Sequence, residues 1–103
     1  MYKICFYVPN THLEEVKNAL FAQGAGKIGG YSHYAWQILG EGQFLPLANS
    51  NPFIGTQNQL EKVSEYKVEM ICNDQYIQAA IAALKKSHPY EEPAYQVWRL
   101  ETL

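Results

Sequence analysis

Tyr2-Lys3-Ile4-Cys5-Phe6-Tyr7-Val8 stands near the start of the chain, and a similar stretch, Tyr66-Lys67-Val68-Glu69-Met70-Ile71-Cys72, begins sixty-four residues later. Both stretches are rich in β-branched, aromatic and other apolar residues, which is typical of buried strands. Each is followed by a segment with helical spacing and then by a strand-like segment that contains Trp36 or Trp98. The sequence therefore predicts two copies of a strand-helix-strand unit.

The first predicted helix follows the first strand. Thr11 and Glu14 have the spacing of a capping box, in which the two side chains bond to free backbone N–H groups of the first turn. Gly24 and Gly26 are expected to end the helix, because glycine accepts the left-handed backbone found at many helix ends. The apolar residues recur at spacings of three and four and therefore share one face: Leu13, Val16, Ala19 and Leu20.

The second predicted helix has the same design. Asn73-Asp74 is expected to cap it, and His88-Pro89 to stop it. Lys85 and Lys86 fall in its last turn, where cations complement the helix dipole. Its apolar face consists of Tyr76, Ile77, Ala80, Ile81 and Leu84.

The remaining strands are predicted from shorter patterns. Residues 32–39 are expected to form a strand, and Gly40-Glu41-Gly42 a tight reversal into residues 43–45, which would give a hairpin. Residues 48–59 are expected to form a loop pinned to a surface. Within that loop, Phe53 and Ile54 either plug it against its own sheet or contact a neighbouring subunit, and the second interpretation is preferred. Further strands are expected at residues 60–72 and 94–100.

This element order predicts one α+β domain, residues 1–103, with the ferredoxin-like arrangement. Two helices would cover one face of an antiparallel sheet. Aromatic residues make up 14% of the chain, so several of them must lie on the other face. We expect that uncovered face to favour self-association, and Trp36 and Trp98 to lie in the sheet-face core or an interface rather than to stack on a ligand.

The composition limits the possible partners and the location of the protein. A net charge of −2 provides no broad basic face, so nucleic-acid binding is not expected. No apolar run reaches the length of a membrane helix, and no signal-peptide pattern follows Met1, so the protein is expected to be cytoplasmic and away from membranes. Cys5 and Cys72 lie in apolar strands and are expected to be buried, reduced thiols.

Five blocks of sequence carry a family resemblance. They are Gly24-Ala25-Gly26-Lys27-Ile28-Gly29-Gly30-Tyr31-Ser32-His33, Gly42-Gln43-Phe44, Asn51-Pro52-Phe53-Ile54-Gly55, Leu60-Glu61-Lys62-Val63 and His88-Pro89-Tyr90-Glu91-Glu92-Pro93-Ala94-Tyr95. In this order they resemble the insert domain of the NIF-three-like proteins, also called YqfO-like or GTP-cyclohydrolase-type-two-like. The resemblance spans nearly the whole chain.

The resemblance implies a fold and an assembly. The family's insert resembles the CutA and PII signalling proteins, which are ferredoxin-like homotrimers, so a homotrimer is implied here. In the large members the insert interrupts domains that carry a dinuclear metal site, and that flanking sequence is not among these 103 residues. We therefore do not expect hydrolase or cyclohydrolase activity to transfer.

The segment from His88 to Pro93 is the first candidate site. It combines an imidazole, a phenol and two carboxylates between prolines that restrict the backbone. His88 with Glu91, or with Glu92, could bind a divalent metal ion together with a ligand from elsewhere. Tyr90 and Glu92 are candidate ligand-binding residues. In the alternative interpretation the prolines shape a turn and the glutamates accept backbone or lysine hydrogen bonds.

The glycine-rich segment from Gly26 to Gly30 is the second candidate. It lacks the spacing of a Walker phosphate loop and enters a strand rather than a helix. Lys27 and backbone N–H groups either bind a carboxylate or phosphate there, or the segment is a plain turn. Tyr31 and His33 are further candidate ligand-binding residues. Because neighbours on a strand point to opposite faces, Ser32 and His33 are not expected to hydrogen-bond as nucleophile and base.

Both candidate segments follow a helix and enter a strand. In a ring of subunits, Lys27 and His33 of one copy could therefore approach His88 and Glu91 of the next. We interpret the chain as a non-enzymatic binding or regulatory module that acts as a homo-oligomer and takes a small ligand or a divalent metal. The alternatives are a metal-assisted hydrolase that uses the segment from His88 to Glu92, and a purely structural oligomeric partner.

Overall fold

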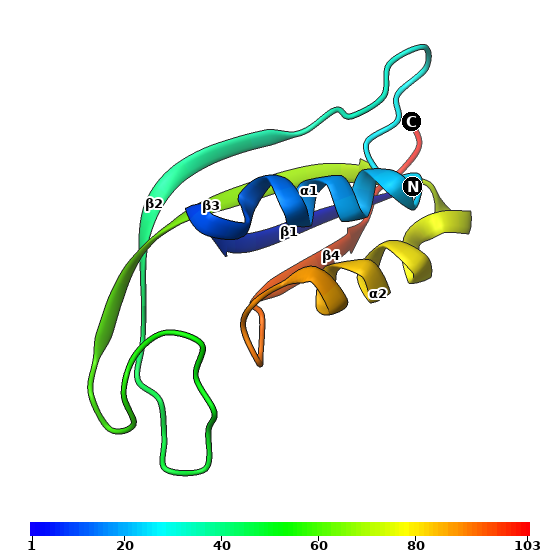
Figure 1. Ribbon diagram of the computed structural model, residues 1–103. Coiled ribbons are helices and arrows are strands. Elements are labelled where there is room, and N and C mark those ends of the chain that lie inside the picture. Colours follow the sequence, from blue (N-terminus) through cyan, green and yellow to red (C-terminus); the bar gives the residue numbers. More distant parts are fainter.

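The computed structural model describes residues 1–103 as two helices packed on a four-stranded sheet (Figure 1). Short 3-10 turns, Asn10–His12 and Asp74–Tyr76, precede the helices. The helices are α1 (Leu13–Ala22) and α2 (Ile77–Ser87), and the strands are β1 (Tyr2–Pro9), β2 (Trp36–Phe44), β3 (Glu61–Cys72) and β4 (Tyr95–Arg99). The predicted duplication is confirmed, because β1-α1-β2 and β3-α2-β4 follow the two halves of the chain.

The sheet has the order β2-β3-β1-β4, and every neighbouring pair is antiparallel. The two similar stretches pair with each other at its centre, where Tyr2 lies opposite Cys72 and Pro9 opposite Glu65. Both helices lie on the same face of this sheet (Figure 1). The predicted ferredoxin-like α+β fold is therefore confirmed.

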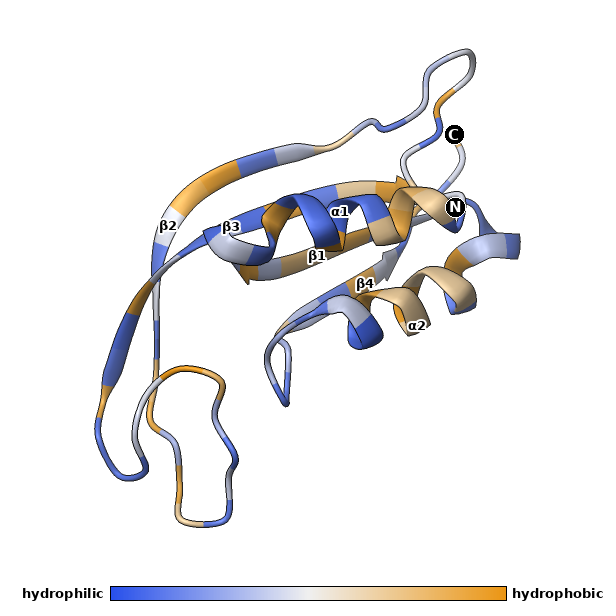
Figure 2. Ribbon diagram, viewed as in Figure 1, coloured by the Kyte–Doolittle hydropathy of each residue, from blue (hydrophilic) through white to orange (hydrophobic).

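The core lies between that face and the helices. Alternate residues of the central strands point into it, including Ile4, Phe6 and Val8 of β1, all fully buried. Burial of one such side chain stabilises the fold by about 1.5–3 kcal/mol. Figure 2 shows hydrophobic and hydrophilic residues alternating along the inner strands. The helices contribute residues of the two apolar faces that their spacing predicted: Leu13, Val16, Leu20, Ile77, Ala80 and Leu84.

The predicted hairpin at Gly40-Glu41-Gly42 is wrong. These residues lie within β2, which runs on to Phe44 and pairs with β3 along its whole length. A connection of residues 45–60 then leads to β3. Gly42 has no role in a turn. A Cβ atom there would lie 2.0 Å from Oε1 of Glu65, so the glycine leaves room for that side chain.

The predicted side-chain caps are also wrong. α1 begins at Leu13, after the 3-10 turn, so Thr11 lies too early to cap it. The Thr11 hydroxyl instead lies 2.9 Å from Nδ1 of His12, and Glu14 pairs with Lys17 at 2.9 Å. Asn73 makes no side-chain cap bond either. In both copies of the unit, a 3-10 turn leads into the helix in place of a capping side chain.

The sheet face opposite the helices is open. Residues that pair across the strands share a face, which places Trp36, Ile38 and Trp98 on this one. Between them, Glu69 pairs with Lys3 at 3.0 Å and with Lys67 at 3.5 Å. The expected exposed aromatics are therefore present, and they flank a group of ion-paired charges.

Cys5 and Cys72 are both free and buried, as predicted. Burial raises the pKa of the Cys72 thiol, which favours the protonated form. Neither helix is long and apolar enough to cross a bilayer.

Candidate functional site

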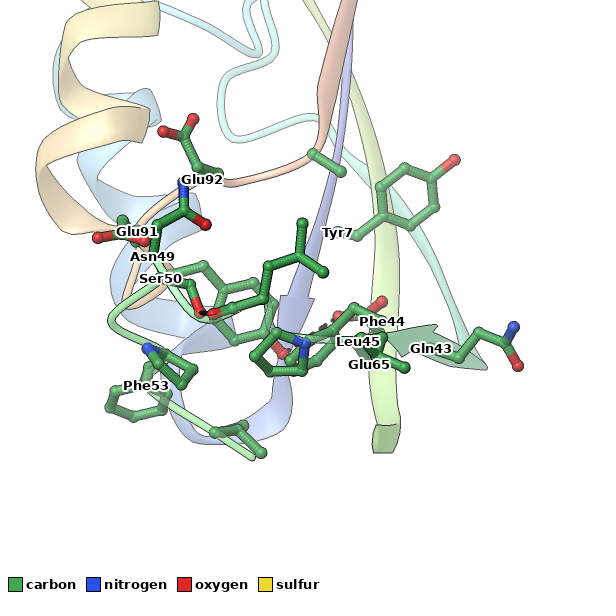
Figure 3. Close-up of a pocket in the computed structure, with 16 residues that line it drawn as sticks. Tyr7, Gln43, Phe44, Leu45, Asn49, Ser50, Phe53, Glu65, Glu91 and Glu92 are labelled. Carbon is green, nitrogen blue, oxygen red and sulfur yellow. Dashed lines mark hydrogen bonds between the residues drawn. The ribbon is translucent and has the colours of Figure 1, made fainter. Parts of the chain in front are cut away.

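A groove of about 590 Å³ lies where the β2-β3 ribbon extends beyond the helices. The segment that joins α2 to β4 and the connection between β2 and β3 form its other walls (Figure 3). A volume in this range suits a small-molecule ligand. The lining residues are Tyr7, Gln43, Phe44, Leu45, Pro46, Leu47, Asn49, Ser50, Pro52, Phe53, Ile54, Glu65, Tyr90, Glu91, Glu92 and Ala94.

His88 fixes the start of the segment between α2 and β4. Its side chain is buried, with 6% of its surface exposed. Nε2 lies 2.6 Å from the Tyr7 carbonyl oxygen, and Nδ1 accepts the Tyr90 N–H at 3.1 Å. This network assigns the ring proton to Nε2, which donates to Tyr7. Burial lowers the His88 pKa, partly offset by the bond to Tyr7, so the ring is neutral.

Glu65 and Tyr90 form a polar pair in the groove. The Tyr90 hydroxyl donates to Oε2 of Glu65 at 3.3 Å. Burial raises the pKa of Glu65, although the bond from Tyr90 partly offsets this effect. Burial also raises the pKa of Tyr90 to about 12, and the neighbouring Glu65 carboxylate adds to that shift. Tyr90 is therefore a protonated hydrogen-bond donor at neutral pH, and Glu65 is a carboxylate with no positive partner.

Aromatic rings surround Tyr90. The centroids of Phe44 and Phe53 lie 6.0 and 6.4 Å from that of Tyr90, and Phe53 also meets His12 edge-on at 5.4 Å. The prediction of a pinned loop is consistent with these contacts, because Phe53 packs against its own chain. A subunit contact through Phe53, which is 53% exposed, stays a prediction.

The connection between β2 and β3 is tied to the opposite wall by a hydrogen bond. The Asn51 N–H donates to Oε1 of Glu91 at 3.2 Å. Figure 3 shows Glu91 beside Asn49 and Ser50 on one side of the groove, and Glu65 with Phe44 and Leu45 on the other. Glu91 therefore accepts a backbone hydrogen bond in the single chain, as the alternative interpretation of its segment predicted.

All the charged side chains that line the groove are carboxylates. Glu65, Glu91 and Glu92 line it, and no lysine, arginine or histidine does. Half of the lining residues are hydrophobic. Such a surface suits a ligand with an apolar body and a positive or hydrogen-bond-donating group.

The predicted site residues divide into two groups. Tyr90, Glu91 and Glu92 line the groove, and His88 lies directly behind it. Lys27, Tyr31 and His33 lie at the other end of the sheet, where the Gly26 N–H donates to the Ile71 carbonyl at 2.8 Å (Figure 1). The two groups are separated because the halves of the chain run antiparallel. A shared site of Lys27 and His33 with His88 and Glu91 therefore requires two subunits and stays a prediction.

Metal binding through His88 and Glu91 also stays a prediction. Both ring nitrogens of His88 already bond to the backbone, so coordination would require one of these bonds to break. No three side chains of the types His, Cys, Asp or Glu are grouped closely enough to hold an ion. In the single chain, His88 has a structural role.

The glycine-rich segment forms a tight turn. Ile28 and Tyr31 exchange two backbone hydrogen bonds of 2.9 Å, with Gly29-Gly30 between them. The expectation that Ser32 and His33 cannot hydrogen-bond is wrong, since Ser32 Oγ lies 3.0 Å from Nδ1 of His33. These residues precede β2, and His33 has a left-handed φ of 59°, so the alternation of a strand does not apply to them.

Glu65, Phe44 and Gly42 were not predicted as site residues from the sequence. Glu65 stands in an alternating strand where it resembles any solvent-facing glutamate. Its position in the groove depends on the register with β2 and on the space left by Gly42. The unusual pair of glycines in β2 was the only local signal, and it suggested a turn.

No family model matches the chain. Proteins named GTP cyclohydrolase 1 type 2 homolog are its curated relatives. The one from Halalkalibacterium halodurans is 46% identical over 100 residues, which is 97% of this chain and 27% of the relative. The one from Bacillus subtilis is 44% identical over 99 residues, or 96% of this chain and 26% of the relative. The chain thus spans about a quarter of the length of these relatives.

Solved structures support the same relationship. A Bacillus cereus protein related to NIF3 is 40% identical, with a TM-score of 0.83 over 98% of this chain and 26% of that protein. The predicted resemblance to NIF-three-like proteins is therefore confirmed. CutA from Archaeoglobus fulgidus (TM-score 0.68, 13% identity, 99% of this chain and 86% of that one) and GlnK from B. subtilis (0.62, 14%, 96% and 83%) share the fold.

Proposed function

We propose that this relative of the GTP cyclohydrolase 1 type 2 homologs is a non-enzymatic binding module that acts as a homo-oligomer. The groove closed by the segment from His88 to Ala94 is the ligand site, and the open sheet face is the association surface. The observation that carries the proposal is the groove itself, with its half-apolar lining and three carboxylates. Its ligand is a small neutral or cationic molecule or a divalent metal ion.

The side chains in the groove support binding rather than catalysis. None of the lining residues is a histidine, cysteine or lysine. The only serine or threonine hydroxyl among the lining residues, that of Ser50, donates to the Leu47 carbonyl at 2.6 Å. A nucleophile needs a neighbouring base to be activated, and the nearby His88 ring bonds to the backbone instead.

The charge of the groove also bears on the reaction that the relatives' name, GTP cyclohydrolase 1 type 2 homolog, suggests. A nucleoside triphosphate carries several negative charges, which three carboxylates without a cation would repel. We therefore do not extend a reaction on GTP to this chain. Its function is binding that leaves the ligand unchanged.

The assembly that we propose is a homotrimer. Trp36 and Trp98 are each about half exposed in the single chain and lie on the open face, and Ile38 lies on the same face two residues from Trp36 on β2. Burying such side chains against other copies removes apolar surface from water. The number of subunits follows from the resemblance of the insert domain to CutA and PII proteins.

Thermal unfolding with four probes tests the binding site. Manganese chloride, choline chloride, the uncharged choline analogue 3,3-dimethylbutan-1-ol and GTP are added separately, because a ligand that binds only the folded state raises the melting temperature. We expect a rise with at least one of the first three probes, no rise with GTP, and no turnover of any probe.

A blocking variant makes this test specific. Ala94→Trp places a large ring in the groove from an exposed position, and Ala82→Trp makes the same change at an exposed position of α2 outside the groove. The rise should disappear in the first variant and persist in the second. Turnover of GTP, no rise with any probe, or a rise that survives Ala94→Trp would refute the proposal.

A further inference from the structure

We propose that the groove selects small organic ammonium ions, which it holds between its aromatic rings and the Glu65 carboxylate. This inference rests on the proposed binding function and names the chemical class of the ligand. It follows from three features of the groove, namely its unpaired negative charge, its aromatic lining and the position of Glu65.

The charges of the groove lack partners within the chain. The ion pairs of the molecule involve other carboxylates, those of Glu14, Glu15, Glu69 and Asp74. Glu65 bonds only to the neutral Tyr90 hydroxyl, and Glu91 only to the neutral Asn51 N–H. A positive ligand therefore supplies the charge complement that the fold leaves out.

The aromatic rings favour an ammonium ion over a bare metal ion. Phe44, Phe53 and Tyr90 all line the groove. The ring centroids of Phe44 and Phe53 lie 6.0 and 6.4 Å from that of Tyr90. The face of an aromatic ring attracts cations, and groups of aromatic rings recognise methylated ammonium ions such as choline. A metal ion needs several oxygen or nitrogen ligands in place, and no such cluster is present.

Gly42 and Tyr90 together fix the place of the Glu65 carboxylate in the groove. Gly42 provides the space, since any Cβ there would collide with the carboxylate. The Tyr90 hydroxyl donates to Oε2 at 3.3 Å, which places the carboxylate at the hydroxyl end of the Tyr90 ring. Burial raises the pKa of this group, and a bound cation would oppose that effect.

Isothermal titration with a matched pair of ligands tests the proposal. Choline and its neutral isostere have nearly the same shape and differ in charge. We expect the wild type to bind choline at least about tenfold more tightly, which corresponds to about 1.4 kcal/mol. Glu65→Gln should remove this preference and leave the affinity for the isostere unchanged. Glu101→Gln makes the same charge change in the C-terminal segment outside the groove and should retain the preference.

The possible failures are distinguishable. If both ligands bind with equal affinity, the proposed binding site stands but selection of ammonium ions is refuted. A choline preference that survives Glu65→Gln would refute the role of Glu65, and no binding of either ligand would overturn this proposal even if manganese still binds. Light scattering of Glu65→Gln provides the last check. If the oligomer dissociates, the occupant is a lysine of a second copy rather than a small ion.

Discussion

Replacing Gly42 with alanine should remove ligand selectivity while leaving the fold intact. The new Cβ would lie 2.0 Å from Oε1 and 2.8 Å from Cδ of Glu65, which is closer than the atoms can approach. These atoms form the end of a flexible side chain, whereas the β2 backbone is held by its pairing with β3. We therefore expect the carboxylate to turn out of the groove and lose its bond with Tyr90.

The expected change in stability is small because two effects oppose each other. Loss of the hydrogen bond between Tyr90 and Glu65 costs about 1 kcal/mol. Replacement of a glycine within a strand by alanine recovers about 0.5–1 kcal/mol of backbone entropy. The free energy of unfolding, measured with urea, should therefore change by less than about 1 kcal/mol. The affinity for choline should fall about tenfold, to that of the neutral isostere.

Gly40→Ala is the matched control. It lies two residues earlier on the same strand, and a Cβ there would meet nothing within 4 Å. This variant should gain about 0.5–1 kcal/mol of stability and bind choline as the wild type does. The reasoning would be refuted if Gly42→Ala kept full choline selectivity. It would equally be refuted by a loss of more than about 2 kcal/mol, because the backbone rather than the side chain would then have moved.

Three further variants test other parts of the structure. Because the pKa of His88 is lowered in the folded protein, the unfolded chain takes up a proton first, and stability falls as the pH drops below 6.5. His88→Gln should flatten this dependence of stability on pH, measured by urea unfolding. An unchanged slope would contradict the lowered pKa of His88. Glu65 has a raised pKa, so its folded form keeps a proton longer and stability falls as the pH rises above 4.5. Glu65→Gln should therefore be more stable than the wild type at about pH 7 and equally stable at about pH 4, whereas a variant less stable at neutral pH would show that the charged form is favoured. Trp98→Glu should reduce the mass measured by light scattering to that of the monomer, 11.8 kDa, with the fold retained. The control Ala82→Glu, on the exposed face of α2, should leave the oligomer intact. An unchanged mass for Trp98→Glu would exclude Trp98 from the interface.

The fold was predictable because its signals are repeated. Two similar strands and two helical patterns must pack as two equivalent units, and their pairing at the centre of the sheet follows. The error at Gly40 and Gly42 has a physical cause. Two glycines around a glutamate are typical of a tight reversal, yet here one of them leaves space for a side chain from the neighbouring strand. Such a contact depends on register, which the local sequence does not encode.

The candidate site was predictable in part. The segment between His88 and Pro93 was recognised by its unusual composition, and three of its residues line the groove. His88 looked like a ligand because an imidazole beside carboxylates suits a metal. The burial of His88 and its bond to Tyr7, eighty-one residues away in sequence, could not be deduced from neighbouring residues. Glu65 carries no local signal, since its environment arises only when β2, β3 and the segment after α2 come together.

Mapping of choline binding on the amide NMR spectrum tests the central claim most directly. We expect the shifts that change to belong to residues 43–54, to Glu65 and to residues 88–94, and the same residues to respond weakly to the neutral isostere. Changes confined to residues 26–34 at the other end of the sheet, or scattered over the surface, would contradict a ligand site in the groove.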